Sequence, residues 1–155
     1  MKKGIKLILC IALPLLVGGL SGFFTSSNID TWFATLNKPT FNPPNYIFGP
    51  VWTTLYTLMG ISLYIVLNKA KTQERFKLLS IFILQLVLNF FWSFIFFKTH
   101  QIGLALIEIL ILWISIVAMI ILFYKTSRLA SLINIPYLLW VSFAAVLNYN
   151  FYILN

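Results

Sequence analysis

The chain has 155 residues, of which 61% are hydrophobic and only 9% are charged, with a formal net charge of +8. A soluble domain usually carries about 25% charged residues, so the composition excludes a soluble protein and indicates an integral membrane protein. The 11 basic residues are scattered between apolar blocks, which excludes a nucleic-acid-binding surface and makes their placement a signal of membrane topology.

Five long apolar stretches follow one another along the chain, each about 18–22 residues long. A helix of about 20 residues crosses the roughly 30 Å hydrocarbon core of a bilayer. None of the stretches alternates apolar and polar residues as the strands of a β-barrel do. The sequence therefore predicts an all-α membrane protein, a single bundle of five transmembrane helices at residues 7–24, 46–67, 78–97, 103–124 and 133–153.

The first stretch follows a basic start and could pass for a secretory signal peptide. Its apolar run of 18 residues is longer than the usual signal core of about 7–15, which favours a retained helix. Gly18 and Gly22 form a GxxxG motif in this stretch, and such a motif lets two helices approach closely. Both a dimer contact and packing inside the bundle fit the motif, and we expect the internal use because a five-helix bundle needs close contacts.

The longest linker, residues 25–45, leads into a segment rich in proline. Four of the six prolines fall between Pro39 and Pro50. Proline fixes φ near −65° and pushes the preceding residue toward extended geometry, so this segment cannot coil into a helix. The prolines either mark helix boundaries or preorganise a lid that loses little entropy when it closes over a ligand. We favour the lid, because helix boundaries account for only one or two of the prolines.

Basic side chains divide unequally between the two ends of the predicted bundle. Nine lie on the side that holds the N-terminus, and only Lys38 and Lys98 lie on the other side. Cytoplasmic loops of membrane proteins carry the excess of Lys and Arg. The sequence therefore predicts a multi-pass protein of the cell membrane, with the N-terminus in the cytoplasm and with the first loop and the C-terminus outside.

Three of the five tryptophans lie on helix faces that also carry polar or aromatic groups: Trp52 with Tyr56, Trp92 with Gln85 and Asn89, and Trp140 with Asn148. Amides in a bilayer must find partners, so these faces turn into the bundle. Their depths would let the three indoles line a cavity that opens outward under the first loop, a shape suited to a flat aromatic ligand. Simple packing of aromatic rings between helices is the alternative, and both interpretations stay open.

The remaining candidate groups are isolated. Trp32 is expected at the membrane interface and Trp113 in contact with lipid or with neighbouring helices. Glu108 is the only acid within a predicted span, which makes it a functional candidate, although a single acid is weak support for a proton relay. His100 could ligate a haem iron once, but a histidine in a turn is more often solvated. No metal-ligand set, catalytic triad or phosphate-binding loop is present, so neither a metal site nor conventional hydrolysis is predicted.

Three segments carry a resemblance to a known family: WFATLNKPTFNPPNYIFGPVWTTLY at 32–56, QLVLNFFWSFIFF at 85–97 and PYLLWVSFAAVLN at 136–148. They resemble the translocator protein family, also called tryptophan-rich sensory proteins or peripheral-type benzodiazepine receptors, in its bacterial form. The resemblance implies a five-helix bundle, often a homodimer, that binds protoporphyrin IX, haem and isoquinoline carboxamide or benzodiazepine-type ligands in a pocket under the first loop. The residues that match the lining of that pocket are Trp32, Pro43, Pro44, Phe48, Trp52, Asn89, Trp92, Trp140 and Ala144.

The resemblance also implies an alternative to binding alone, because some bacterial members are similar to light-dependent catalysts that degrade porphyrins. The two tryptophans implicated there match Trp52 and Trp140. A photoexcited porphyrin with oxygen forms reactive species, and an adjacent indole could form a radical that directs the oxidation. Enzymatic activity therefore stays open, and transport of the same ligands ranks last because no inverted repeat or broken helix pair is present.

No obligatory cofactor is expected, and a porphyrin would be ligand or substrate. Eukaryotic members carry a sterol motif in which Leu or Val is followed by Tyr and then by Lys or Arg. Leu147 and Tyr149 are present here, but no basic residue follows them before Asn155. Since the motif is incomplete and such patterns are weak, sterol binding is not expected.

Overall fold

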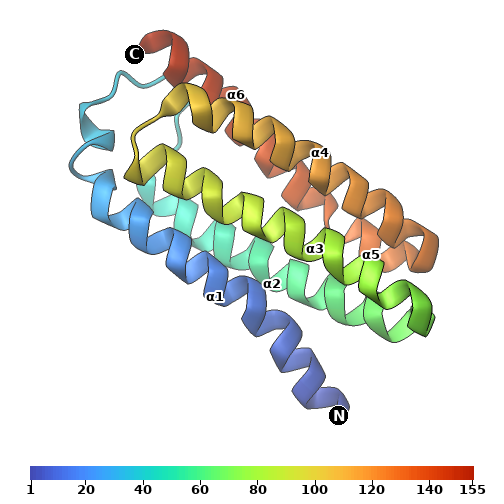
Figure 1. Cartoon of the computed structure of the whole chain (residues 1–155). Coiled ribbons are helices and arrows are strands. Elements are labelled where there is room, and N and C mark those ends of the chain that lie inside the picture. Colours follow the sequence, from blue (N-terminus) through green and yellow to red (C-terminus); the bar gives the residue numbers. More distant parts are fainter.

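The computed structural model describes residues 1–155 as helices and connecting segments, with no strand. Five helical segments are long and apolar enough to cross a membrane, which confirms the predicted all-α fold with five spans. Figure 1 shows them as one bundle of long helices. The long helices are α1 (Lys3–Ile29), α2 (Asn45–Lys69), α3 (Thr72–Ser93), α4 (Ile102–Thr126) and α6 (Ile135–Leu154). Three short elements join them: the 3₁₀ turn η1 (Phe33–Thr35), the π-helical turn η2 (Phe94–Lys98) and α5 (Arg128–Leu132).

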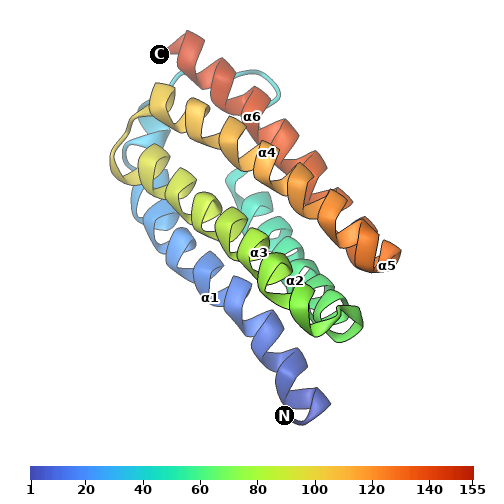
Figure 2. The same cartoon turned by 45° about the vertical axis from the view of Figure 1, so that its right-hand side comes forward.

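Neighbours in the bundle do not simply follow the chain order. α1 packs against both α2 and α3, α3 packs against α4, and α4 packs against α6. The views in Figures 1 and 2 agree on this order. The first loop and the C-terminus lie together at one end of the bundle, which we call the loop end, and the N-terminus lies at the other end.

The first loop is shorter than the sequence predicts, because α1 continues to Ile29 instead of ending near residue 24. The polar side chains in this last part bond back to carbonyl groups of the preceding turn. Thr25 Oγ1 donates to the Ser21 carbonyl at 3.2 Å, and Asn28 Nδ2 donates to the Phe24 carbonyl at 2.9 Å. Such bonds satisfy the side chains within the helix, so a polar sequence that resembles a linker stays helical. The expected linker 25–45 is therefore a loop only from Asp30 to Pro44.

α1 and α2 cross closely at two glycines. A Cβ atom at Gly60 would lie 2.7 Å from the Cys10 carbonyl oxygen and 2.9 Å from the Ile11 backbone nitrogen. A Cβ atom at Gly18 would collide with the ring of Tyr56. Small residues at these points let the two helices approach to backbone contact. Gly18 of the predicted GxxxG motif therefore serves packing within the chain, as expected.

The end of α3 differs from a regular helix and prepares the site. In η2 the backbone follows π-helical geometry over five residues. A π-turn changes the angular spacing of its side chains, and such turns are frequent at functional sites. Here Phe96 and Phe97 are both buried although they are adjacent in sequence, and both face the same cavity.

Candidate functional site: an aromatic cavity at the loop end

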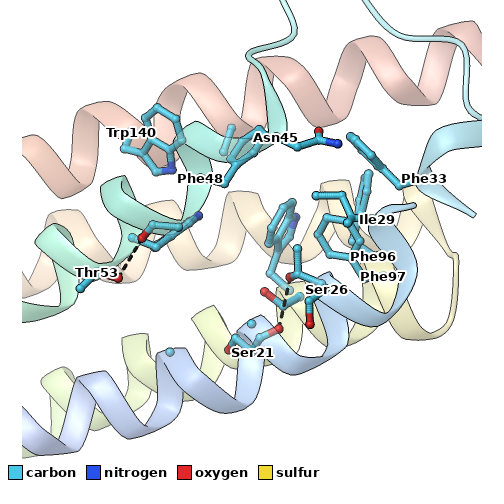
Figure 3. Close-up of a pocket in the computed structure, with 18 of the residues that line it drawn as sticks. Ser21, Ser26, Ile29, Phe33, Asn45, Phe48, Thr53, Phe96, Phe97 and Trp140 are labelled. Atoms are coloured by element: carbon cyan, nitrogen blue, oxygen red, sulfur yellow. Dashed lines mark hydrogen bonds between the residues drawn. The ribbon is translucent and has the colours of Figure 1, made fainter. Parts of the chain in front are cut away.

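A cavity of about 630 Å³ lies inside the bundle at the loop end. Its lining comes from the outer part of α1, the first loop, the first turns of α2, the end of α3 with η2, and α6 from Trp140 to Phe151. Figure 3 shows Trp140 and Phe48 on one side of this space, and Ser21 and Ser26 of α1 on the other. Phe33, Phe96 and Phe97 lie together at the loop end of the same space.

The structure brings the three predicted indoles together, because Trp52, Trp92 and Trp140 all line this cavity. They come from α2, α3 and α6, so the inward direction of all three faces follows the need of their polar neighbours for partners. Phe48 and Ala144, also matched through the resemblance, line the cavity as well. Binding of a ligand by these residues stays a prediction.

Each of the three indoles is held by a different contact. Trp52 stacks on Tyr56 with ring centroids 5.4 Å apart and planes at 27°. Trp92 Nε1 donates to Asn148 Oδ1 at 2.9 Å, which ties α3 to α6. Trp140 contacts Phe48 with centroids 6.0 Å apart and planes at 68°. These contacts fix the rings before any ligand arrives, which limits the entropy that binding costs.

A buried chain of hydrogen bonds forms the floor beneath Trp52. Tyr56 Oη donates to Asn89 Oδ1 at 2.6 Å, and Asn89 Nδ2 donates to Tyr137 Oη at 2.9 Å. Tyr137 Oη in turn donates to Gln85 Oε1 at 2.7 Å. The chain joins α2, α3 and α6, so it sets the spacing of the helices that carry the three indoles. Networks whose members are all satisfied rigidify the surrounding core.

Two of the three cavity indoles have an N–H group that donates to no atom of the protein. Trp92 donates to Asn148, and Trp113 donates to Ser142 Oγ at 2.8 Å. Trp52 and Trp140 donate to no atom of the chain, although both face the cavity. Their N–H groups are therefore available to a hydrogen-bond acceptor on a ligand. Trp113 lies away from the cavity on α4, where the residue is 37% exposed, in keeping with the expected lipid or packing contact.

Four residues matched through the resemblance do not line the cavity: Trp32, Pro43, Pro44 and Asn89. Asn89 lies in the floor, where both ends of its amide are used by tyrosine hydroxyls. Asn42, next to Pro43, lines the cavity in place of the two prolines. The rigid proline pair therefore positions its neighbours, and its own rings stay outside.

Trp32 and His100 form a contact that the sequence did not predict. The two rings are stacked with centroids 4.2 Å apart and planes at 7°. His100 Nε2 lies 3.2 Å from Asn28 Oδ1, and its backbone φ is +59°. His100 is exposed, as expected for a histidine in a turn, and its ring also joins the turn before α4 to the first loop. No three His, Cys, Asp or Glu residues come together in a way that could hold a metal ion.

The first loop covers the cavity and is clasped to the end of α6. The Asn37 backbone N–H donates to Asn155 Oδ1 at 2.9 Å, and Asn155 Nδ2 donates to the Asn37 carbonyl at 3.0 Å. Lys38 Nζ donates to the Phe33 carbonyl at 3.0 Å, which folds the loop over its own buried Phe33 ring. We call the Asn37–Asn155 pair the clasp. It agrees with the expectation of an ordered lid, and no pattern in the sequence indicated it.

Sequence reasoning also missed the α1 wall of the cavity, which consists of Leu15, Gly18, Gly19, Ser21, Gly22, Thr25, Ser26 and Ile29. Most of these side chains are small, so α1 presents a nearly flat surface opposite the aromatic rings. The signal was that seven of the ten residues from Gly18 to Ser27 are Gly, Ser or Thr, but a GxxxG motif indicates helix contact more often than a ligand surface.

Glu108 of α4 lies buried with neither carboxylate oxygen hydrogen-bonded to the protein. It is only 8% exposed, so its carboxylate neither reaches the surface nor bonds to another group of the protein. We expect Glu108→Leu to stabilise the protein by about 1–3 kcal/mol, because a buried polar group without a partner costs roughly that much. Thermal unfolding in detergent checks this, with the exposed Glu74→Leu as the control. A loss of stability in Glu108→Leu would contradict the prediction.

Comparison with known proteins gives one consistent family. The sequence profile of the TspO/MBR family matches residues 10–154. The chain is 40% identical over 151 residues to the tryptophan-rich protein TspO of Archaeoglobus fulgidus, and the matched region covers 97% of each chain. It is 38% identical over 120 residues to the translocator protein of Homo sapiens, covering 76% of this chain and 71% of the human one. It is 31% identical over 126 residues to the tryptophan-rich sensory protein of Cereibacter sphaeroides, covering 81% and 78%.

Proposed function

The chain belongs to the TspO/MBR family, and from this premise we propose that it is a membrane protein that binds flat aromatic ligands of the porphyrin type at the loop end. Protoporphyrin IX and haem are the expected ligands, and isoquinoline carboxamide or benzodiazepine-type compounds are the expected synthetic ones. One observation carries the proposal, the cavity of about 630 Å³ with three indoles in its lining. This volume falls within the range of about 300–1,000 Å³ typical of small-molecule sites.

The two faces of the cavity suit a flat ring. Trp52, Trp92 and Trp140 offer aromatic surfaces against which a conjugated ring packs favourably. The small side chains of α1 leave room for the opposite face of such a ring. The free N–H groups of Trp52 and Trp140 supply two donors for polar atoms of the ligand. A largely apolar pocket with a few placed polar groups is the usual form of a site for a small organic ligand.

Light- and oxygen-dependent degradation of protoporphyrin IX is the second candidate function. The observation that favours it is the exposure of two unbonded indoles, Trp52 and Trp140, to one cavity. Light would excite the bound porphyrin and dioxygen would be the oxidant, while an adjacent indole gives up an electron and directs the attack. The binding proposal does not depend on this chemistry.

The orientation in the membrane is part of the same proposal. Arg75 and Lys77 at the start of α3 and Lys125 at the end of α4 lie at the end opposite to the loop end, together with the basic N-terminus. The positive-inside rule places that end in the cytoplasm. The cavity would then face the outer half of the cell membrane. Association into a homodimer stays a prediction of the resemblance.

Titration of purified protein with protoporphyrin IX in light and in dark tests both candidates. We expect saturable binding to the unmodified protein, and weakening by about tenfold in Trp52→Phe and in Trp140→Phe, which corresponds to roughly 1.4 kcal/mol per lost indole contact. Trp113→Phe, whose ring lies outside the cavity, is the matched control and should bind as the unmodified protein does. Absorbance spectra in empty detergent micelles correct for simple partitioning of the porphyrin.

The outcomes separate the candidates. Binding with a light-dependent product that is absent from both cavity variants supports the enzyme. Binding without a protein-specific product supports a receptor or sensor. If the unmodified protein shows no saturable binding, or if Trp113→Phe weakens binding as much as the cavity variants do, the proposal is wrong.

A further inference from the structure

The exposed part of the cavity lining comes from only two helices and their junction with the first loop. The exposed lining residues are Gly19, Gly22, Ser26, Asp30, Asn45, Tyr46, Gly49 and Thr53. They belong to the outer part of α1 with the residue after it, and to the first turns of α2. Every lining residue from α3, η2 and α6 is buried or half-buried. The cavity therefore reaches the surface between α1 and α2, on the side of the bundle.

Three glycines on this stretch leave the space between α1 and α2 open. A Cβ atom at Gly19, Gly22 or Gly49 would meet no atom within 4 Å. Nearer the middle of the same helices, a Cβ atom at Gly18 or Gly60 would strike the partner helix. α1 and α2 thus touch at Gly18 and Gly60 and separate beyond them toward the loop end. We call the gap bordered by Gly19, Gly22 and Ser26 on α1, and by Gly49 and Thr53 on α2, the side window.

Contacts of the first loop restrict access from the loop end. Phe33 of the first loop is 4% exposed and lines the cavity from above. The clasp ties the loop to α6, and the stacked rings of Trp32 and His100 tie it to the turn before α4. The expected opening outward under the loop stays a prediction, and these contacts favour a lateral route over it. The loop therefore lies over the cavity as a roof.

The surroundings of the side window are those of a lipid-facing surface. Leu16, Leu20 and Phe23 of α1 are each more than 60% exposed and flank it. Ser26, Asp30 and Asn45 border the end of the side window nearest the first loop. Gly19 lies seven residues before Ser26 on α1, which is about 10 Å deeper in the membrane along the helix. The rim thus changes from polar to apolar with depth. This gradient fits a flat apolar ring that carries its polar substituents on the edge nearest the headgroups.

We propose that a flat aromatic ligand dissolved in the bilayer reaches the cavity sideways, through the side window between α1 and α2, while the first loop stays closed. The identity of the ligand rests on the proposed function, but the position of the opening does not. Substitution of the window glycines by large side chains should close the route. None of them has a positive φ, so the backbone accepts a side chain without strain.

The first test needs no porphyrin. In vesicles containing a Cys10→Ser background, a new thiol is placed on the far wall of the cavity by Ala144→Cys. We expect rapid labelling by the membrane-soluble pyrenyl maleimide and little by a charged, water-soluble maleimide. Adding Gly22→Phe and Gly49→Phe together should slow the pyrenyl reaction by at least about tenfold, within the range that one site's variants span in association rate. Gly4→Phe, at another open glycine far from the window, should not slow it.

Two results of this test would overturn the proposal. Faster labelling by the charged reagent, increased further by the clasp variant Asn155→Ala, would show access from water above the loop. No labelling of the Ala144→Cys variant, under conditions where Leu20→Cys on the lipid-facing surface of α1 reacts, would show that the window is closed.

The second test uses protoporphyrin IX already partitioned into the vesicles and follows quenching of tryptophan fluorescence. With Gly22→Phe and Gly49→Phe, the rates of association and dissociation should fall together by about tenfold while the dissociation constant changes by less than about threefold. A change in the dissociation constant that comes from the dissociation rate alone, with an unaltered association rate, would mean that these glycines only shape the site. Absence of porphyrin binding alongside window-dependent labelling would refute the proposed function and leave the side window standing.

Discussion

Gly60→Leu is expected to destabilise the protein by about 3 kcal/mol or more, the upper part of the range for overpacked cores. The atoms that a side chain at Gly60 would strike belong to the backbone of Cys10 and Ile11 in α1. Backbone atoms of a helix cannot turn aside as a flexible side chain does, so α1 must move away from α2 as a whole. Because α1 also forms one wall of the cavity, ligand binding should be lost along with stability.

Thermal unfolding in detergent and the fraction of monodisperse protein measure this effect. Gly60→Ala should give an intermediate loss, since its single methyl group already meets the backbone of α1. Gly19→Leu is the matched control within the membrane, because a Cβ atom there meets nothing within 4 Å. Equal stability of Gly60→Leu and Gly19→Leu would contradict the close crossing of α1 and α2.

Asn89→Leu is expected to cost about 2–3 kcal/mol of stability. Asn89 is 3% exposed, and its amide links Tyr56 of α2 to Tyr137 of α6. Leucine cannot replace either hydrogen bond, which leaves the Tyr56 hydroxyl buried without its partner. A buried group in that state costs roughly 1–3 kcal/mol, and the loosened contact between helices adds to it. Ligand affinity should fall too, because Trp52 stacks on Tyr56.

A double-mutant cycle distinguishes the network from simple packing. Tyr56→Phe alone should also destabilise the protein, since it leaves the side-chain oxygen Oδ1 of Asn89 without a hydrogen-bond donor. The double variant Asn89→Leu with Tyr56→Phe should be less destabilised than the sum of the two single variants, because both partners of one bond are removed together. Strictly additive losses would show that the Tyr56–Asn89 bond contributes nothing to stability.

Much of the fold could be predicted because the bilayer imposes it. A length of about 20 apolar residues identifies a span, and the separation of the spans identifies the turns. The predicted ends of the helices were less accurate where polar side chains form hydrogen bonds within their own helix. Thr25 and Asn28 bond within α1, so the helix continues through a polar segment to Ile29. Local hydrogen bonds of this kind leave no periodic pattern in the sequence.

The aromatic part of the cavity lining could also be predicted from the sequence. An amide in a membrane helix must point toward other helices, so Asn89 and Asn148 indicate the inward direction for Trp92 and Trp140. The same reasoning does not say which amide faces the cavity and which lies in the floor. Asn148 lines the cavity, whereas the side-chain amide of Asn89 is hydrogen-bonded to Tyr56 and Tyr137. That distinction depends on the depth in the bundle at which α2, α3 and α6 come into contact.

The sequence by itself determined the class of protein, the five spans and the inward faces of the three indoles, because the hydrophobic effect and the need to satisfy polar groups act on each helix separately. Only the tertiary structure decided the clasp, the Trp32–His100 stack, the isolation of Glu108 and the open space at Gly19, Gly22 and Gly49. These features depend on where two helices cross. The crossing point follows from close contact at Gly18 and Gly60, and its position relative to the other helices is a property of packing that no single helix encodes.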